Sequence, residues 1–138
     1  MTSYRSLLAE RRALQIAVAI GGLVPVAAGL AGVLIGPALV QRGLADMAML
    51  DSHFRYLSGL LLGIGLAYWG LIPSIERRGR AFRLLTAIVF AGGLGRLAGV
   101  ELHGLPPLPM LFGLGMELLV TPLLCVWQWR VSRQVASA

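Results

Sequence analysis

The feature that most constrains this chain is an apolar run at residues 13–36 that contains no charged side chain. As a helix it would be about 36 Å long at about 1.5 Å per residue, enough to cross a hydrocarbon core about 30 Å thick. Arginines precede the run, as they would in a secretory signal peptide, but it is too long for a signal core of about 7–15 residues. We therefore expect a retained transmembrane helix, kinked at Pro25.

Three further apolar runs predict three more spans, at about residues 52–73, 82–103 and 109–129. Residues 37–51 are apolar enough to lie on the bilayer surface around Arg42 and Asp46. Composition agrees, because only 13% of the residues are charged, against about 25% in a typical soluble domain. The sequence predicts an all-α fold: a membrane-embedded four-helix bundle, antiparallel and up-down, forming a single domain over residues 1–138.

The arginines predict the orientation of this bundle. The chain has 12 basic residues, and all of them are arginine. Arg42 lies on one side of the predicted membrane, with Arg55 near that interface, and nine arginines collect on the other side. Since basic residues favour the cytoplasmic side, we expect both termini there, in a multi-pass protein of the bacterial inner membrane. The nine are Arg5, Arg11, Arg12, Arg77, Arg78, Arg80, Arg83, Arg130 and Arg133.

Several function classes are disfavoured. The net charge of +6 does not indicate nucleic-acid binding, because the arginines flank apolar runs instead of forming a polar face with aromatic residues. We expect membrane lipids as their partners. Cys125 is the single cysteine, which rules out a Cys-x-x-Cys zinc or redox motif. His53 and His103 lie at helix edges and make no haem or zinc site. We expect no metal and no cofactor, and the absence of a nucleophile–base pair argues against a hydrolase.

Two opposite charges lie inside the predicted spans, where a charge is costly and is usually paired or functional. Arg96 lies about 10 Å below the outer surface, counted from His103 at the end of its span. Glu117 lies about 12 Å below the same surface, counted from Pro109. Consecutive helices joined by a short turn pack against each other in opposite directions. The spacing therefore predicts an Arg96–Glu117 ion pair.

Other polar residues share helical faces with this pair or with each other. At 100° per residue, Arg96 lies on a stripe with Gly92, Gly93, Gly99 and His103. Glycines in such a stripe let another helix approach closely. Together the faces predict a polar cluster in the outer half of the bundle. Its residues are Arg96, Glu117, Arg55, Ser58, Asp51, Thr121 and His103.

Three segments carry a resemblance to a known family. They are His-Phe-Arg-Tyr-Leu-Ser-Gly-Leu at residues 53–60, Phe-Ala-Gly-Gly-Leu-Gly-Arg-Leu at residues 90–97, and Met-Glu-Leu at residues 116–118 before Pro122. The chain resembles an uncharacterised family of small bacterial four-helix membrane proteins, a domain of unknown function distantly related to the DoxX/DoxD-like group. The resemblance implies the bundle but no established activity, although some DoxD-like relatives are subunits of quinone-linked sulfur oxidation.

The role of the polar cluster stays open between a structural clamp, a ligand pocket and an ion path. Conduction is the least favoured, because arginine keeps the paired carboxylate ionised. The first hypothesis is a non-enzymatic protein that binds a lipid-like or small amphipathic ligand, or a partner helix. Arg96 would hold an anionic or carbonyl group, Glu117 would orient Arg96, and Arg55 would guard the entrance. The alternatives are an accessory subunit of a quinone-linked membrane oxidoreductase, and a small transporter acting as a homodimer.

Overall fold

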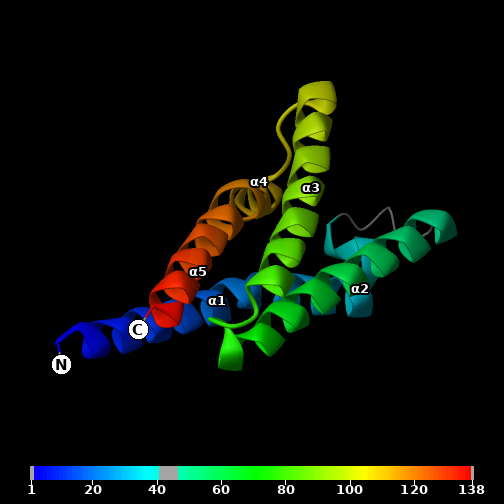
Figure 1. The fold of residues 1–138 in the computed structure, drawn as a ribbon. Coiled ribbons are helices and arrows are strands. Elements are labelled where there is room, and N and C mark those ends of the chain that lie inside the picture. Colours follow the sequence, from blue (N-terminus) through cyan, green and yellow to red (C-terminus); the bar gives the residue numbers. More distant parts are fainter. Residues whose placement is uncertain (1, 41–46, 138) are drawn as a thin grey trace. The chain divides into compact units, whose positions relative to one another are not determined.

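The computed structural model describes residues 2–40 and 47–137, and all regular secondary structure in these ranges is helical. Within these ranges, four helical stretches are long and apolar enough to cross a membrane, as many as the sequence predicts: Arg5–Leu39, Ala48–Ser74, Gly79–His103 and Leu108–Ala136. The helices are α1 (Thr2–Ile35), α2 (Ala48–Leu71), α3 (Gly79–His103), α4 (Leu108–Gly115) and α5 (Thr121–Ala136), drawn in Figure 1. Shorter elements are the 3-10 turns Gly36–Leu39 and Ile72–Ser74 and the π-helical segment Met116–Val120.

The helices extend beyond the predicted apolar runs, so the predicted bounds were too short. α1 begins at Thr2 instead of residue 13, and α5 ends at Ala136 instead of residue 129. Hydrophobicity marks only the part of a helix that would lie in lipid, whereas helical hydrogen bonding continues through arginine, glutamate and glutamine, which are good helix formers. α1 also continues through Pro25 as one helix. Of the predicted surface segment, Arg42 and Asp46 lie outside the described residues.

The chain divides into two compact units. The first, which we call the α1–α2 unit, is Ala17–Ile72 and contains most of α1 together with α2. The second, the α3–α5 unit, combines Met1–Ile16 with Pro73–Ala138 and contains α3, α4 and α5.

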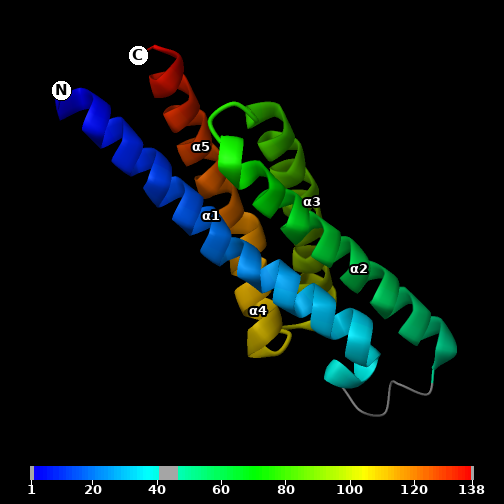
Figure 2. The ribbon, with the colours of Figure 1, turned by 90° about the horizontal axis from the view of Figure 1, so that it is seen from below.

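Glycine allows the two helices of the α1–α2 unit to approach closely. A Cβ atom built at Gly29 would lie 2.8 Å from both the Leu62 Cα and the Ser58 carbonyl oxygen, which is too close for any side chain. In the same way, a Cβ atom at Gly32 would collide with the Ser58 side chain, and one at Gly65 would collide with Val26. As the residue number increases along α1, the number of the α2 residue in contact decreases. The two helices lie side by side in Figure 2.

A buried hydrogen bond organises the α3–α5 unit. Gln128 of α5 is fully buried, and its Nε2 donates to the Ile75 carbonyl oxygen at 2.8 Å. A Cβ atom built at Gly79, the first residue of α3, would lie 3.4 Å from both polar atoms of the Gln128 side chain. Phe82 and Val131 are also almost fully buried. The Gln128 amide therefore ties the turn that precedes α3 to the middle of α5.

The glycine contacts yield a test of the helix packing. Gly29→Ala should lower the free energy of unfolding by about 1–3 kcal/mol, because the methyl group would push α1 away from the Leu62 backbone. Gly63→Ala is the matched control on α2, since no atom lies within 4 Å of a Cβ built there. It should be neutral or stabilise by up to about 1 kcal/mol, because alanine favours helix over glycine. Thermal unfolding in detergent, followed by circular dichroism, measures both. Equal effects would contradict the close approach.

Candidate functional site

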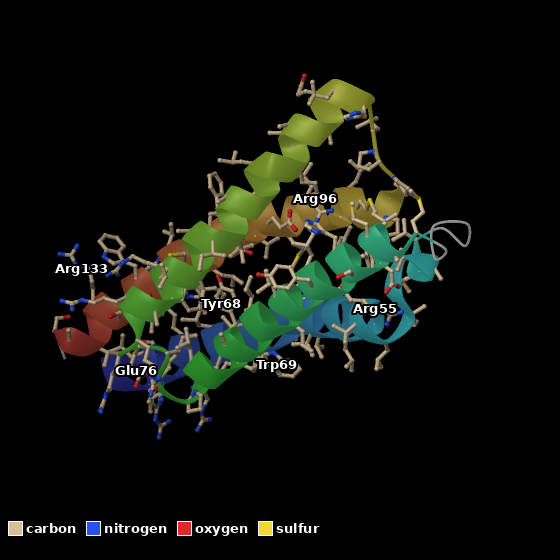
Figure 3. All side chains as sticks on the ribbon, turned by 90° about the vertical axis from the view of Figure 1, so that its right-hand side faces the viewer. Arg55, Tyr68, Trp69, Glu76, Arg96 and Arg133 are labelled. Atoms are coloured by element: carbon tan, nitrogen blue, oxygen red, sulfur yellow. The ribbon has the colours of Figure 1, made fainter. Side chains whose placement is uncertain are left out.

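Arg96 and Glu117 form a bidentate ion pair between α3 and the π-helical segment. The Arg96 Nε lies 3.0 Å from Glu117 Oε2, and Nη2 lies 3.0 Å from Oε1. The Arg96 side chain is 38% exposed and the Glu117 side chain 17% exposed. Figure 3 shows the Arg96 guanidinium reaching toward the neighbouring helix. The ion pair inferred from equal membrane depth is thus present, in the geometry that gives the strongest charge-assisted hydrogen bonds.

One glycine of the Arg96 stripe brings the two backbones close enough for this pair. A Cβ atom at Gly93 would lie 2.7 Å from Leu118 Cδ2 and 3.0 Å from Glu117 Cβ. A Cβ atom at Gly92 or at Gly99 would have no atom within 4 Å. Close packing at Gly93, one turn before Arg96, therefore sets the reach of the guanidinium, while Gly99 leaves open space beside it.

Glu117 lies within the π-helical segment Met116–Val120, which the sequence did not predict. Both the Thr121 amide and the Thr121 hydroxyl donate to the Met116 carbonyl oxygen, the hydroxyl at 2.7 Å. Pro122 follows, and a proline ring clashes with the carbonyl four residues earlier in a regular α-helix. Widening the turn relieves that clash, and such π-bulges are frequent at functional sites. The Thr121 hydroxyl thus supports the turn that presents Glu117.

Arg96 also lines an open hollow of about 370 Å³ at the C-terminal end of α3. His103 and Met110 share the wall with Arg96, so two predicted site residues meet at one surface. Gly104, with φ of 86°, ends α3 at this rim in a conformation that favours glycine. In the described part of the chain, Arg96 donates to Glu117 with two of its five N–H groups. The others are available to an acceptor in the hollow.

Arg55 has a different environment from the one expected of an entrance guard. Its Nε donates to both Asp51 oxygens, at 3.1 and 2.9 Å, and its Nη1 donates to the carbonyls of Val33 and Leu34 in the last turn of α1. The last carbonyls of a helix lack partners within the helix and attract cations. Arg55 therefore caps α1, and Gly36, with φ of 73°, makes the turn beside it.

The predicted site residues fall into two groups. Arg96, Glu117, Thr121 and His103 belong to the α3–α5 unit. Asp51, Arg55 and Ser58 belong to the α1–α2 unit, where Ser58 is buried against Gly32. A single cluster of all seven stays a prediction.

The sequence interpretation missed ion pairs at the opposite end of the α3–α5 unit. Arg11 Nε contacts Glu76 Oε2 at 2.9 Å, and Arg11 Nη2 donates to the Pro73 carbonyl at 3.0 Å. The Glu76 side chain is only 10% exposed. Arg130 lies 3.5 Å from Glu10. An acidic residue within the basic turn of residues 74–83 was the signal for a partner. Among residues 2–40 and 47–137, no group of three His, Cys, Asp or Glu side chains is placed so that it could hold a metal ion.

The Arg96–Glu117 pair can be tested by a double-mutant cycle. Glu117→Gln and Arg96→Leu should each destabilise clearly, by about 3–5 kcal/mol, because each strands a charge at membrane depth. Arg96→Leu combined with Glu117→Leu should recover much of the loss, since both charges are then removed. Glu101→Gln, at an exposed position on α3, is the control. Thermal unfolding in detergent measures all four, and a double mutant as damaged as the sum of the singles would show that the residues do not interact.

One family matches the chain. Its description is Domain of unknown function (DUF4345), and the match covers residues 13–128, which include parts of all four membrane-length stretches. No curated protein and no solved structure matches the chain. The relation to the DoxX/DoxD-like group stays a prediction. Because the family covers most of the sequence, the chain belongs to the family Domain of unknown function (DUF4345).

Proposed function

We propose that this protein is a multi-pass membrane protein that binds a small amphipathic or lipid-like molecule in the hollow beside Arg96. One observation carries the proposal: an arginine held bidentately by a carboxylate stands 38% exposed in the wall of an otherwise mostly apolar hollow. Ligand sites are typically apolar with a few placed polar groups that orient the ligand.

The chemistry of the hollow favours a ligand with an oxygen acceptor and an apolar body. Glu117 occupies one edge of the guanidinium and holds its plane. The remaining N–H groups suit a carbonyl, ester or carboxylate oxygen. Val100, Leu105 and Met110 would contact the apolar part of the ligand. His103, at the rim, would lie near the polar head.

The proposed setting is an antiparallel up-down bundle in a bacterial inner membrane, with both termini in the cytoplasm. Contacts in which one residue number rises while the other falls support the antiparallel order. In the α1–α2 unit Gly29 meets Leu62 and Gly32 meets Ser58, and in the α3–α5 unit Gly79 meets Gln128 and Gly93 meets Leu118. The nine arginines near the termini and the α2–α3 turn support the orientation. The hollow would then open in the outer half of the bilayer.

Topology is tested with fusions in bacterial cells. A reporter fused after Ala138 should read cytoplasmic, and one inserted after Gly43 should read periplasmic, because nine arginines outweigh Arg42 on the other side. A paired set of a phosphatase active outside and a fluorescent protein active inside gives opposite signals at each site. Activity of the phosphatase fused after Ala138 would overturn the orientation.

Ligand binding is tested by native mass spectrometry of the detergent-extracted protein, with a medium-chain fatty acid and its methyl ester as probes. Gly99→Leu should abolish retention of the probes, because Gly99 lines the hollow and has open space above it. Gly95→Leu is the matched control, since its Cβ position is equally open but lies outside the hollow. It should bind as the unaltered protein does.

The same spectra separate the alternatives. If the guanidinium recognises a carbonyl oxygen, Arg96→Leu combined with Glu117→Leu should weaken the binding of both the ester and the acid. Copurified quinone that Gly99→Leu removes would identify a quinone as the bound amphiphile. Equal probe retention by all variants would show that the hollow binds nothing, and the Arg96–Glu117 pair would then be structural.

A further inference from the structure

A second hollow, of about 460 Å³, lies along one face of the end of α5. Its residues follow one another at the three- and four-residue spacing of a single helical stripe. They are Val126, Trp129, Arg130, Arg133, Gln134 and Ser137. This stripe, which we call the α5 groove, plays no part in the hollow beside Arg96.

The α5 groove lies where the span leaves the hydrocarbon. Counting from Leu108, about 20 residues at about 1.5 Å each cross a core about 30 Å thick, which places the boundary near residue 128. Val126, 62% exposed, then faces acyl chains, and Trp129 lies at the boundary, where tryptophan is enriched. Arg130 and Arg133 lie beyond it, among the head groups.

Arg133 stacks on the Trp129 ring. Its guanidinium carbon lies 4.9 Å from the centre of the Trp129 ring, a cation–π contact. Stacking occupies the flat face of the guanidinium and leaves its N–H edge for a bidentate acceptor. Arg130 is 67% exposed, and its Nε is 3.5 Å from the Glu10 carboxylate, so most of its donors also remain available.

The surrounding charge favours an anion. All nine arginines that predicted the cytoplasmic side belong to the α3–α5 unit. Among the described residues, Glu10 and Glu76 contact these arginines, Glu76 through Arg11 and Glu10 through Arg130. The excess of positive charge attracts anionic lipid head groups at this membrane surface.

We propose that the α5 groove binds an anionic phospholipid. Arg133 and Arg130 receive the phosphate, Trp129 lies at the glycerol level, and Val126 contacts the first carbons of an acyl chain. The apolar lower edge distinguishes a lipid from a free phosphate ion, which would gain nothing from Val126 or from the tryptophan at the boundary. This site does not depend on the ligand proposed for the hollow beside Arg96.

The test is native mass spectrometry of the full chain with equal amounts of phosphatidylglycerol and phosphatidylcholine. The unaltered protein should retain phosphatidylglycerol preferentially. Arg130→Gln with Arg133→Gln should lower that preference by at least about fivefold, the effect expected for one arginine near a lipid surface. Arg77→Gln with Arg80→Gln removes the same charge from the same end outside the groove and should lower it much less. Equal losses in the two pairs would overturn the site in favour of diffuse attraction.

Two further arms complete the test. Arg133→Lys keeps the charge but loses the planar fork that stacks on Trp129, so it should reduce the preference while the protein unfolds at an unchanged temperature. Full preference in Arg133→Lys would overturn the role of the stacked guanidinium. Inorganic phosphate at millimolar concentration should not displace the lipid. Displacement would show that the groove binds free phosphate instead.

Discussion

Polar groups in the hydrocarbon core of a membrane have no water to bond with, so each must find a partner within the chain. Several polar side chains in the membrane-length helices of this protein have such partners. Arg96 bonds Glu117, Arg55 bonds Asp51 and the end of α1, and the Trp69 indole donates to the Ala19 carbonyl at 3.1 Å. The Thr86 hydroxyl bonds the Phe82 carbonyl within α3. The bonds of Arg96 to Glu117, of Arg55 to the end of α1 and of Trp69 to Ala19 join neighbouring helical segments. The same helices otherwise present apolar surface outward, such as the exposed Ile20, Leu34 and Leu123.

Arg55 and Arg96 belong to different units, and their partners give the two arginines different environments. The donors of Arg55 are directed to a carboxylate one turn away and to two helix-terminal carbonyls, so its charge is used in holding α1 against α2. Arg96 meets a single carboxylate and keeps an exposed edge at an open hollow. A guanidinium that is oriented but incompletely used is the better candidate for contact with a ligand.

The fourth span shows how a local irregularity can serve a site. Proline in a helix interior is costly, and here the cost is relieved by a π-bulge whose carbonyl accepts from Thr121. Glu117 lies within that bulge, opposite the close approach at Gly93. At the far end of the same span, α5 continues as a helix beyond the predicted apolar run that ends at residue 129, which places Trp129 and Arg133 one turn apart. Both candidate sites thus depend on how this span departs from a plain apolar helix.

The sequence by itself determined the four spans, the asymmetry of arginine and the Arg96–Glu117 pair. Span length follows from bilayer thickness, and depth can be counted at 1.5 Å per residue, so two charges at equal depth on consecutive helices can be matched without a structure. Only the tertiary structure decided that Arg55 caps α1, that Gln128 bonds Ile75, and that Gly93 instead of Gly99 makes the close contact. Those partners are 22 and 53 residues apart for the two hydrogen bonds. Whether such partners come into contact depends on how each helix is rotated about its axis. Helical periodicity shows which residues share a face, but side-chain packing decides which helix that face contacts.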